Sequence, residues 1–154
     1  MNLKIIWLGK NKDAWISDAI KEYSKRLGPF TKLEIVQLAD VSIKIAGTSE
    51  VVIAKESKLI EAKLCADDYV VVLDERGEER TSLEFSRFLI NISEGKRVVF
   101  VIGGVFGISD EIKNRADTCL SLSRLTFTHR MARVILIEQI YRAMMIAGGK
   151  NYHI

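Results

Sequence analysis

Three segments in the C-terminal half combine residue types that commonly bind ligands, and the first is rich in glycine. Gly103, Gly104 and Gly107 follow Val98–Ile102, a run that is apolar at every position. In parallel α/β sheets, ligands bind beyond the carboxyl ends of the strands, and glycine lets the backbone approach them closely. The spacing lacks the first glycine of the dinucleotide-binding pattern, and the chain has no Walker phosphate-binding loop. A tight turn into the next helix would have the same spacing, so both interpretations stay open at this point.

The second segment, Leu122–Arg130, mixes apolar side chains with hydroxyl groups. It follows a weak strand pattern at Thr118–Ser121 and leads into a long apolar helix pattern. Ligand pockets combine apolar walls with a few polar groups, and this composition suits an adenine ring or a methionyl chain. An ordinary strand-to-helix connection is the alternative interpretation.

The third segment is the C-terminal tail, in which Tyr152 and His153 follow the pair Gly148-Gly149. Tyrosine can stack on a nucleobase, and histidine can move a proton near neutral pH. The tail is therefore a candidate functional segment, and a docked but inert end is the alternative.

Positive charge is concentrated in the same part of the chain. The whole chain has a formal net charge of +3, whereas residues 122–154 carry five basic residues and one acidic residue. Such a field attracts a phosphate-bearing partner. A solvated helix face is the alternative, and charge alone does not decide between the two.

Composition excludes several other classes of protein. Cys65, Cys119 and the two histidines are scattered, so we predict no metal site and two buried, reduced thiols. No run reaches the roughly 18 apolar residues of a membrane span, and the N-terminus lacks a signal-peptide pattern. We therefore expect a cytoplasmic protein with one domain over residues 1–154.

The elements that position these segments alternate between strand and helix patterns. Apolar runs predict strands at Leu3–Leu8, Leu33–Leu38, Tyr69–Leu73, Val98–Ile102 and Thr118–Ser121. Helix-period patterns and capping residues predict helices over Asp13–Leu27, over Ser49–Leu64, after the capping box Thr81-x-x-Glu84, after Ser109, and over Arg130–Ala147. In the first helix Trp15 is expected on the apolar face. The alternation predicts an α/β domain with a mostly parallel sheet and flanking helices.

The last predicted helix, Arg130–Ala147, is apolar around most of its circumference. Such a helix is buried on more than one side. In so small a chain we expect a second subunit to cover one side, which predicts a two-fold homodimer. Glu138 is predicted to pair with Arg142, four residues later on the same face.

Together these segments resemble the RlmH family of the SPOUT superfamily, whose members are ribosomal RNA large-subunit methyltransferases. The resemblance covers the whole chain and rests on five motifs in order: VVLD at 71–74, IGGxxG at 102–107, LSxLTFxH at 122–129, RVxxxEQxYRA at 133–143, and the terminal Tyr152-His153. Thr128 stands where the family often has proline, and Ile154 where relatives usually place a basic residue.

The resemblance implies an α/β fold whose C-terminal part is threaded into a trefoil knot, a homodimer, and S-adenosylmethionine as cofactor. It implies methylation of the N3 atom of a pseudouridine in 23S ribosomal RNA, within the large subunit or the assembled ribosome. By position, the residues that would bind the cofactor are Leu73, Gly103, Gly104, Leu122, Ser123, Arg124, Leu125, Thr126 and Phe127.

The implied reaction aligns a methyl donor with a nitrogen that must lose a proton. The candidate catalytic residues are His153 as general base, Tyr152 beside it, and Arg133 or Arg142 as anion stabiliser or phosphate clamp. His129 is expected to fix the preceding loop. Two alternatives stay open. A non-catalytic ribosome assembly factor would not bind the cofactor, and a nucleotide-dependent oxidoreductase would bind a nicotinamide instead.

Overall fold

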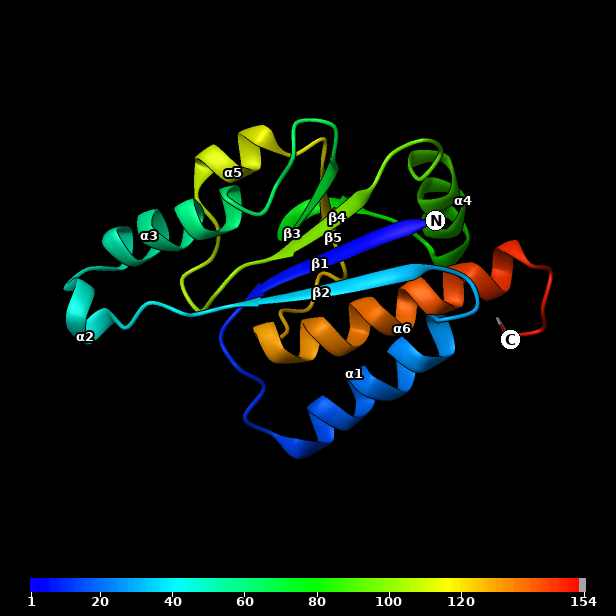
Figure 1. Ribbon diagram of the computed structural model, residues 1–154, viewed down its shortest axis with the longest axis horizontal. Helices are drawn as coiled ribbons and strands as arrows, with labels where there is room; N and C mark the ends of the chain where they lie inside the picture. Colours follow the sequence, from blue (N-terminus) through cyan, green and yellow to red (C-terminus); the bar gives the residue numbers. More distant parts are fainter. Residues whose placement is uncertain (153–154) are drawn as a thin grey trace.

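The computed structural model describes residues 1–152, and its centre is a five-stranded sheet in the order β2-β1-β4-β3-β5 (Figure 1). All paired strands are parallel. Each predicted strand is present, and the bounds are β1 Asn2–Leu8, β2 Lys32–Leu38, β3 Tyr69–Glu79, β4 Val98–Ile102 and β5 Thr118–Ser121. The predicted α/β class is confirmed.

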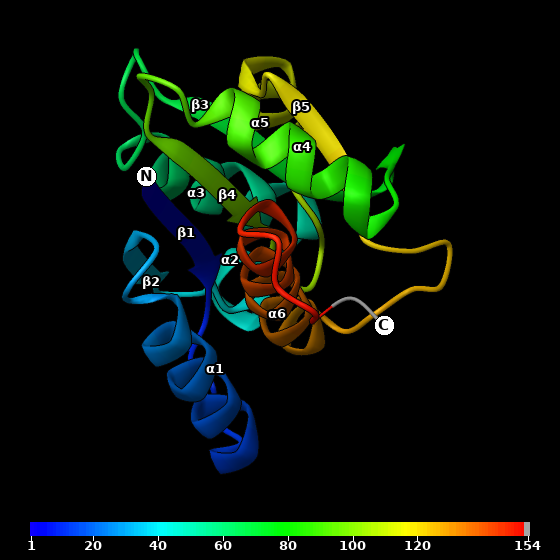
Figure 2. The same cartoon turned by 90° about the vertical axis from the view of Figure 1, so that its right-hand side faces the viewer.

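Helices cover both faces of this sheet. Their bounds are α1 Ala14–Leu27, α2 Ile43–Ala46, α3 Ser49–Glu61, α4 Ser82–Ile92, α5 Asp110–Arg115 and α6 His129–Ala147. Side chains alternate along a strand, so Ile5 and Trp7 pack with α1, α4 and α6, whereas Ile6 and Leu8 pack with α3 and α5. Figure 2 shows α6 and α4 on one side of the strands and α3 on the other. No helix within residues 1–152 is both long and apolar enough to cross a membrane.

The predicted helix caps are present. The hydroxyl of Thr81 accepts from the backbone of Glu84, whose carboxylate accepts in return from the backbone N–H of Thr81. Ser109 caps α5 by accepting from Ile112 N. The single turn α2 was not predicted, because four residues are too few to produce a helix periodicity.

Two predictions of burial were wrong. Trp15 is 58% exposed, because the stripe of α1 that faces the core contains Ile16 and Ile20, and Trp15 points at least about 100° away from each of them. Cys65 is exposed in the turn after α3, where its Sγ atom accepts a hydrogen bond from Arg97 Nη2 at 3.2 Å. Cys119 is half-buried in β5.

Helix α6 is surrounded on several sides by its own chain. It packs against α1, α4 and the sheet, and Leu136, Ile137 and Ile140 are fully buried. Figure 2 shows α6, seen nearly end-on, below β4 and between α4 and α1. The apolar circumference of α6 is thus largely explained within one subunit. The homodimer therefore stays a prediction, as does the trefoil threading.

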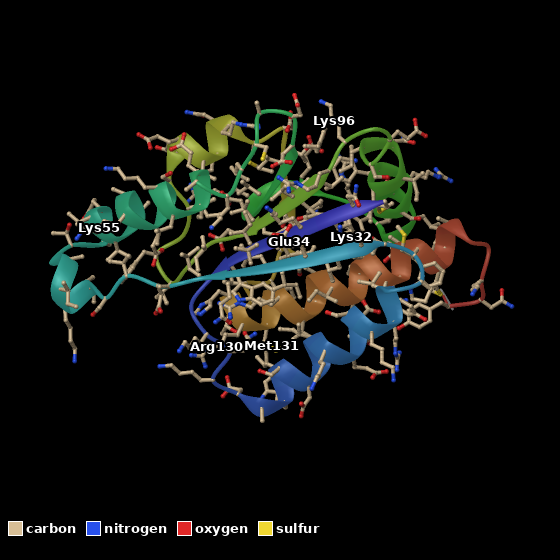
Figure 3. All side chains as sticks on the ribbon, viewed as in Figure 1. Lys32, Glu34, Lys55, Lys96, Arg130 and Met131 are labelled. Atoms are coloured by element: carbon tan, nitrogen blue, oxygen red, sulfur yellow. The ribbon has the colours of Figure 1, made fainter. Side chains whose placement is uncertain are left out.

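One cation is buried within this packing. Arg133 of α6 is fully buried, and its guanidinium donates to the carbonyls of Leu8 and Gly9 at the end of β1 and to Asn11 Oδ1. The guanidinium carbon lies 5.0 Å from the centre of the Trp7 ring. Near it, Arg130 lies in the first turn of α6, where Figure 3 labels it. It pairs with Asp13 at 2.8 Å. These contacts fix the start of α6 against the carboxyl end of β1.

We predict that Arg133→Met destabilises the fold by leaving buried carbonyl oxygens without a donor. Each such acceptor costs about 1–3 kcal/mol, so the free energy of unfolding should fall by at least about 2 kcal/mol in urea titrations. The matched control is Arg124→Met, which removes a guanidinium whose side chain is 88% exposed. An Arg133→Met protein as stable as the control would contradict the assigned role.

Candidate functional site

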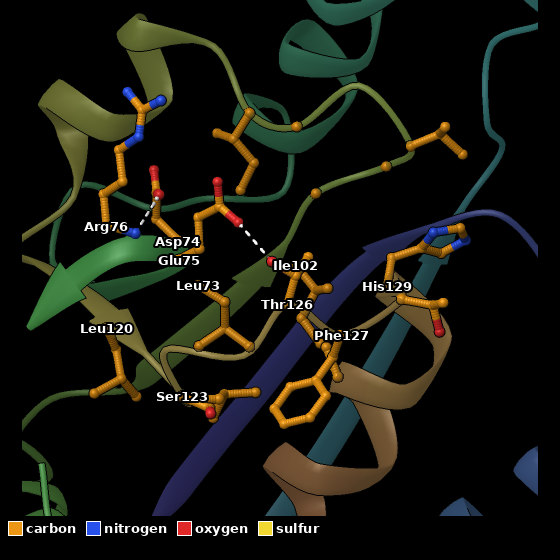
Figure 4. A pocket seen from close by; sticks show the side chains of 18 of the residues that line it. Leu73, Asp74, Glu75, Arg76, Ile102, Leu120, Ser123, Thr126, Phe127 and His129 are labelled. Atoms are coloured by element: carbon orange, nitrogen blue, oxygen red, sulfur yellow. Dashed lines mark hydrogen bonds between the residues drawn. The ribbon is translucent and has the colours of Figure 1, made fainter. Parts of the chain in front are cut away.

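The first two predicted segments meet in a cavity of about 680 Å³ at the carboxyl ends of β3, β4 and β5 (Figure 4). We call it the loop cavity. Eight of the nine predicted cofactor-binding residues line it: Leu73, Gly103, Gly104, Leu122, Ser123, Leu125, Thr126 and Phe127. Arg124 does not line it, because its exposed side chain pairs with Glu79 at 3.0 Å. Parallel strands bring their carboxyl ends to one edge, so loops distant in sequence become neighbours.

The first wall is the glycine loop after β4. Gly107 has φ of 89°, a conformation that favours glycine, and its N–H donates to Gly104 O at 3.2 Å. A Cβ atom on Gly103 would lie 2.6 Å from Ile108 Cγ1 and 3.0 Å from the Gly107 carbonyl carbon. The loop therefore folds tightly on itself, and both the backbone of its glycines and the side chains of Val105 and Phe106 line the cavity.

The second wall is the loop from Leu122 to Thr128. Ser123 Oγ accepts from Leu125 N at 3.0 Å, and Thr126 Oγ1 donates to Glu75 Oε2 at 3.2 Å (Figure 4). Leu125 is 74% exposed, so the cavity has an apolar rim. Thr128 ends the loop by capping α6, accepting from Met131 N at 3.3 Å. Thr128, which stands where the resembled family often has proline, therefore still allows α6 to begin at His129.

The third wall comes from an irregularity in β3 that was not predicted. Leu73 and Glu78 both pair with Leu120 of β5, so the residues between them bulge out of the sheet. Asp74 in this bulge forms an ion pair with Lys113 and accepts from Arg76 N at 2.9 Å. The hydrogen bond from Lys113, followed by that from Arg76, lowers the pKa of Asp74. The cavity wall therefore contains an ion pair, in which Asp74 is ionised and Lys113 offsets its charge.

His129 opens α6 and lines the loop cavity, and its predicted role in fixing the preceding loop stays a prediction. Burial lowers the pKa of its imidazole, and the nearby positive charges of Arg133 and Arg130 lower it further. The side chain is neutral at pH 7 and can both donate and accept a hydrogen bond.

The three candidate catalytic residues that the structure describes lie apart from the loop cavity within one subunit. Arg142 Nη2 donates to Glu138 Oε1 at 2.6 Å, which confirms the predicted pair, and its guanidinium lies 4.9 Å from the Tyr152 ring centre. Neither Arg142 nor Tyr152 lines the cavity, and neither does Arg133. His153 lies outside the described residues.

Several cavity residues were missed by sequence reasoning. Glu75, Arg76 and Lys113 line the loop cavity but belong to no recognised pattern. A usable signal was available, since any polar residue directly after an apolar parallel strand lies at the ligand-binding edge. Glu75 and Arg76 meet this criterion, because the predicted strand ends at Leu73 and they follow it within three residues.

Comparisons with known proteins agree with one another. Residues 1–153 match the family described as "Predicted SPOUT methyltransferase". Relatives named "Ribosomal RNA large subunit methyltransferase H" include one from Geobacter metallireducens, 41% identical over 99% of each chain, and one from Maridesulfovibrio salexigens, 42% identical over 98% of this chain and 97% of the relative.

Solved structures are similar in fold alone. A probable methylase family protein from Haemophilus influenzae has a TM-score of 0.59 at 14% identity, covering 99% of this chain and 70% of that one. A putative methylase family protein from Neisseria gonorrhoeae has a TM-score of 0.56 at 17% identity, covering 91% and 81%.

We predict that His129 makes the fold less stable in mild acid. Its pKa lies below the ordinary value of 6.5, so the unfolded chain binds the proton more readily and stability falls as pH drops through 6.5. His129→Gln should reduce the loss of unfolding free energy between pH 7.5 and 5.5, measured in urea. The control is His153→Gln, which replaces the other histidine of the chain. An unchanged pH dependence in His129→Gln would contradict the prediction.

Proposed function

Because the chain belongs to the SPOUT methyltransferase family, we propose that it transfers a methyl group from S-adenosylmethionine to N3 of a pseudouridine in 23S ribosomal RNA. The observation that carries this proposal is the loop cavity itself. Its glycine loop and the Leu122–Phe127 loop are far apart in sequence, yet both line one cavity at the carboxyl edge of the sheet.

The chemistry of the cavity walls fits this cofactor. Leu73, Leu122 and Leu125 provide apolar surface for an adenine ring, and the Gly103–Gly107 backbone provides hydrogen-bonding groups. Glu75 provides negative charge toward a sulfonium or an ammonium group, and Asp74, although paired with Lys113, provides further acceptor oxygens. When bound, S-adenosylmethionine supplies the electrophilic methyl group. The residues of the chain hold it and align the acceptor with it.

The acceptor nitrogen of a pseudouridine is an imide that must lose its proton. We keep His153 as the proposed base, with Tyr152 stacking on the RNA and Arg142 stabilising the anion or a phosphate. Arg133 has a different proposed role, because it is fully buried and its Nη1 and Nη2 atoms donate to Leu8, Gly9 and Asn11. It positions the start of α6 instead of contacting RNA.

A homodimer would bring these groups to the cavity. Within one subunit Arg142 and Tyr152 pack against each other, and neither lines the loop cavity. We propose that a second copy contributes its tail to complete the site. Ribosomal RNA in the large subunit or the assembled ribosome is the proposed substrate, which places the activity in the cytoplasm. The basic residues of the C-terminal part would attract its phosphates.

Deletion of the gene tests the proposed reaction and substrate together. Mass spectrometry of ribosomal RNA from the deleted strain should show the loss of one methyl group at one pseudouridine, and the wild-type gene should restore it. An unchanged methylation map would favour the assembly-factor alternative and contradict the proposal.

We also predict that Gly103→Ala weakens binding of S-adenosylhomocysteine. The new Cβ atom would lie 2.6 Å from Ile108 Cγ1 and press on the Gly107 backbone, so the loop must shift. Calorimetry should show affinity reduced by about tenfold or more, equivalent to about 1.4 kcal/mol. Gly28→Ala, at the end of α1, is the control. Equal affinities of the two variants would contradict a role for the glycine loop in cofactor binding.

A further inference from the structure

A second cavity, of about 440 Å³, adjoins the loop cavity at the carboxyl ends of β1 and β2. The two cavities share Gly104, Val105, Phe106 and His129 as lining residues. Figure 4 shows His129 over β1 and β2, at one end of the loop cavity. A group bound in the second cavity would therefore be next to a cofactor bound in the first. We call the second one the Glu56 cavity, after its most unusual lining residue.

Glu56 of α3 is a buried carboxylate with a free oxygen. The residue is 4% exposed, and its Oε1 atom accepts from Val41 N at 3.0 Å. Its Oε2 atom is buried and has no hydrogen-bond partner among residues 1–152. Burial, followed by the charge of Asp40, raises the pKa of this carboxyl. A buried acceptor without a donor is costly, so its presence in a cavity wall points to a donor supplied by a ligand.

The free oxygen faces the glycine loop. A Cβ atom on Gly104 would lie 2.8 Å from Glu56 Oε2. Any other residue at this position would therefore displace the oxygen. Gly104 also lines the loop cavity. The unpaired acceptor therefore lies beside the wall that the two cavities share.

The Glu56 cavity is also lined by three basic side chains, beside the acidic Asp40. Lys10, Lys12 and Arg130 all line it. Arg130 is held by Asp13 at 2.8 Å, whereas neither lysine forms an ion pair within the part of the chain that the structure describes. A ligand with phosphate groups and a hydrogen-bond donor would match the basic side chains and the free oxygen, and a nucleotide has both features.

Pseudouridine differs from uridine on one edge of the base. Both bases have an N3–H, but pseudouridine carries a second donor, N1–H, where uridine has a carbon-bound hydrogen. A site with a buried acceptor for such an N–H rejects the analogue that lacks it, because the acceptor is then left unpaired. A free carboxylate oxygen beside the methyl-donor pocket is the group that this discrimination requires.

We propose that the Glu56 cavity holds the target base and that Glu56 Oε2 accepts its N1–H, making Glu56 a specificity-determining residue. The inference rests on the proposed function. Lys10 and Lys12 contact the flanking phosphates. The N1 edge of the base then faces Glu56 on α3. The adjacent N3 edge faces the cofactor, so that N3 can accept the methyl group.

Glu56→Gln tests this assignment with an isosteric change. Val41 N–H requires an acceptor, so the amide oxygen stays on Val41 and the amide NH₂ group replaces Oε2. A donor then faces the N1–H donor. The assay measures kcat/KM for ribosomes with pseudouridine at the target and for ribosomes from a strain lacking the pseudouridine synthase. Glu61→Gln, exposed on the same helix, is the control.

We expect the wild type and Glu61→Gln to prefer pseudouridine, and Glu56→Gln to lose about 10- to 100-fold on pseudouridine with little change on uridine. Affinity for S-adenosylhomocysteine should stay within about twofold. Glu56→Ala, which removes the acceptor without adding a donor, should lower the preference less. A preference for pseudouridine that stays at the wild-type level in Glu56→Gln or in Glu56→Ala would overturn the inference. So would the absence of this preference from the wild type. Failure of the wild type to methylate either ribosome would instead contradict the proposed function.

Discussion

The fold depends on one buried cation that ties its last helix to its first strand. Arg133 donates to the backbone carbonyls of Leu8 and Gly9, and burial lowers the pKa of its guanidinium to about 10. The side chain still carries its charge at neutral pH, balanced by carbonyl dipoles and the face of the Trp7 ring. Because the loop from Leu122 to Thr128 leads directly into α6, this contact also sets where one wall of the loop cavity stands.

The second constraint is the parallel sheet. All strands run in one direction, so the loops after β1, β3, β4 and β5 emerge at the same edge. Two adjoining cavities form there, and they share the glycine loop and His129. One fold edge thus provides room for a methyl donor beside a nucleotide. The proposed chemistry needs alignment of donor and acceptor, for which two adjoining cavities are suited.

Local patterns predicted most of the fold. The apolar run Val98–Ile102 and the capping box at Thr81 describe interactions between residues close in sequence, and both are present in the structure. Features that depend on distant partners could not be predicted in the same way. Trp15 was misplaced because the register of α1 against α6 decides its exposure. The free oxygen of Glu56 is visible only once α3 and the glycine loop are brought together.

Hydrogen–deuterium exchange with and without S-adenosylhomocysteine tests the central claim most directly, because it reports which backbone segments the ligand covers. We predict slower exchange in Gly103–Gly107 and in Leu122–His129 together, with the turn after α3 unchanged. Protection of one loop without the other, or protection elsewhere in the chain alone, would contradict a methyl-donor site built jointly from these two loops.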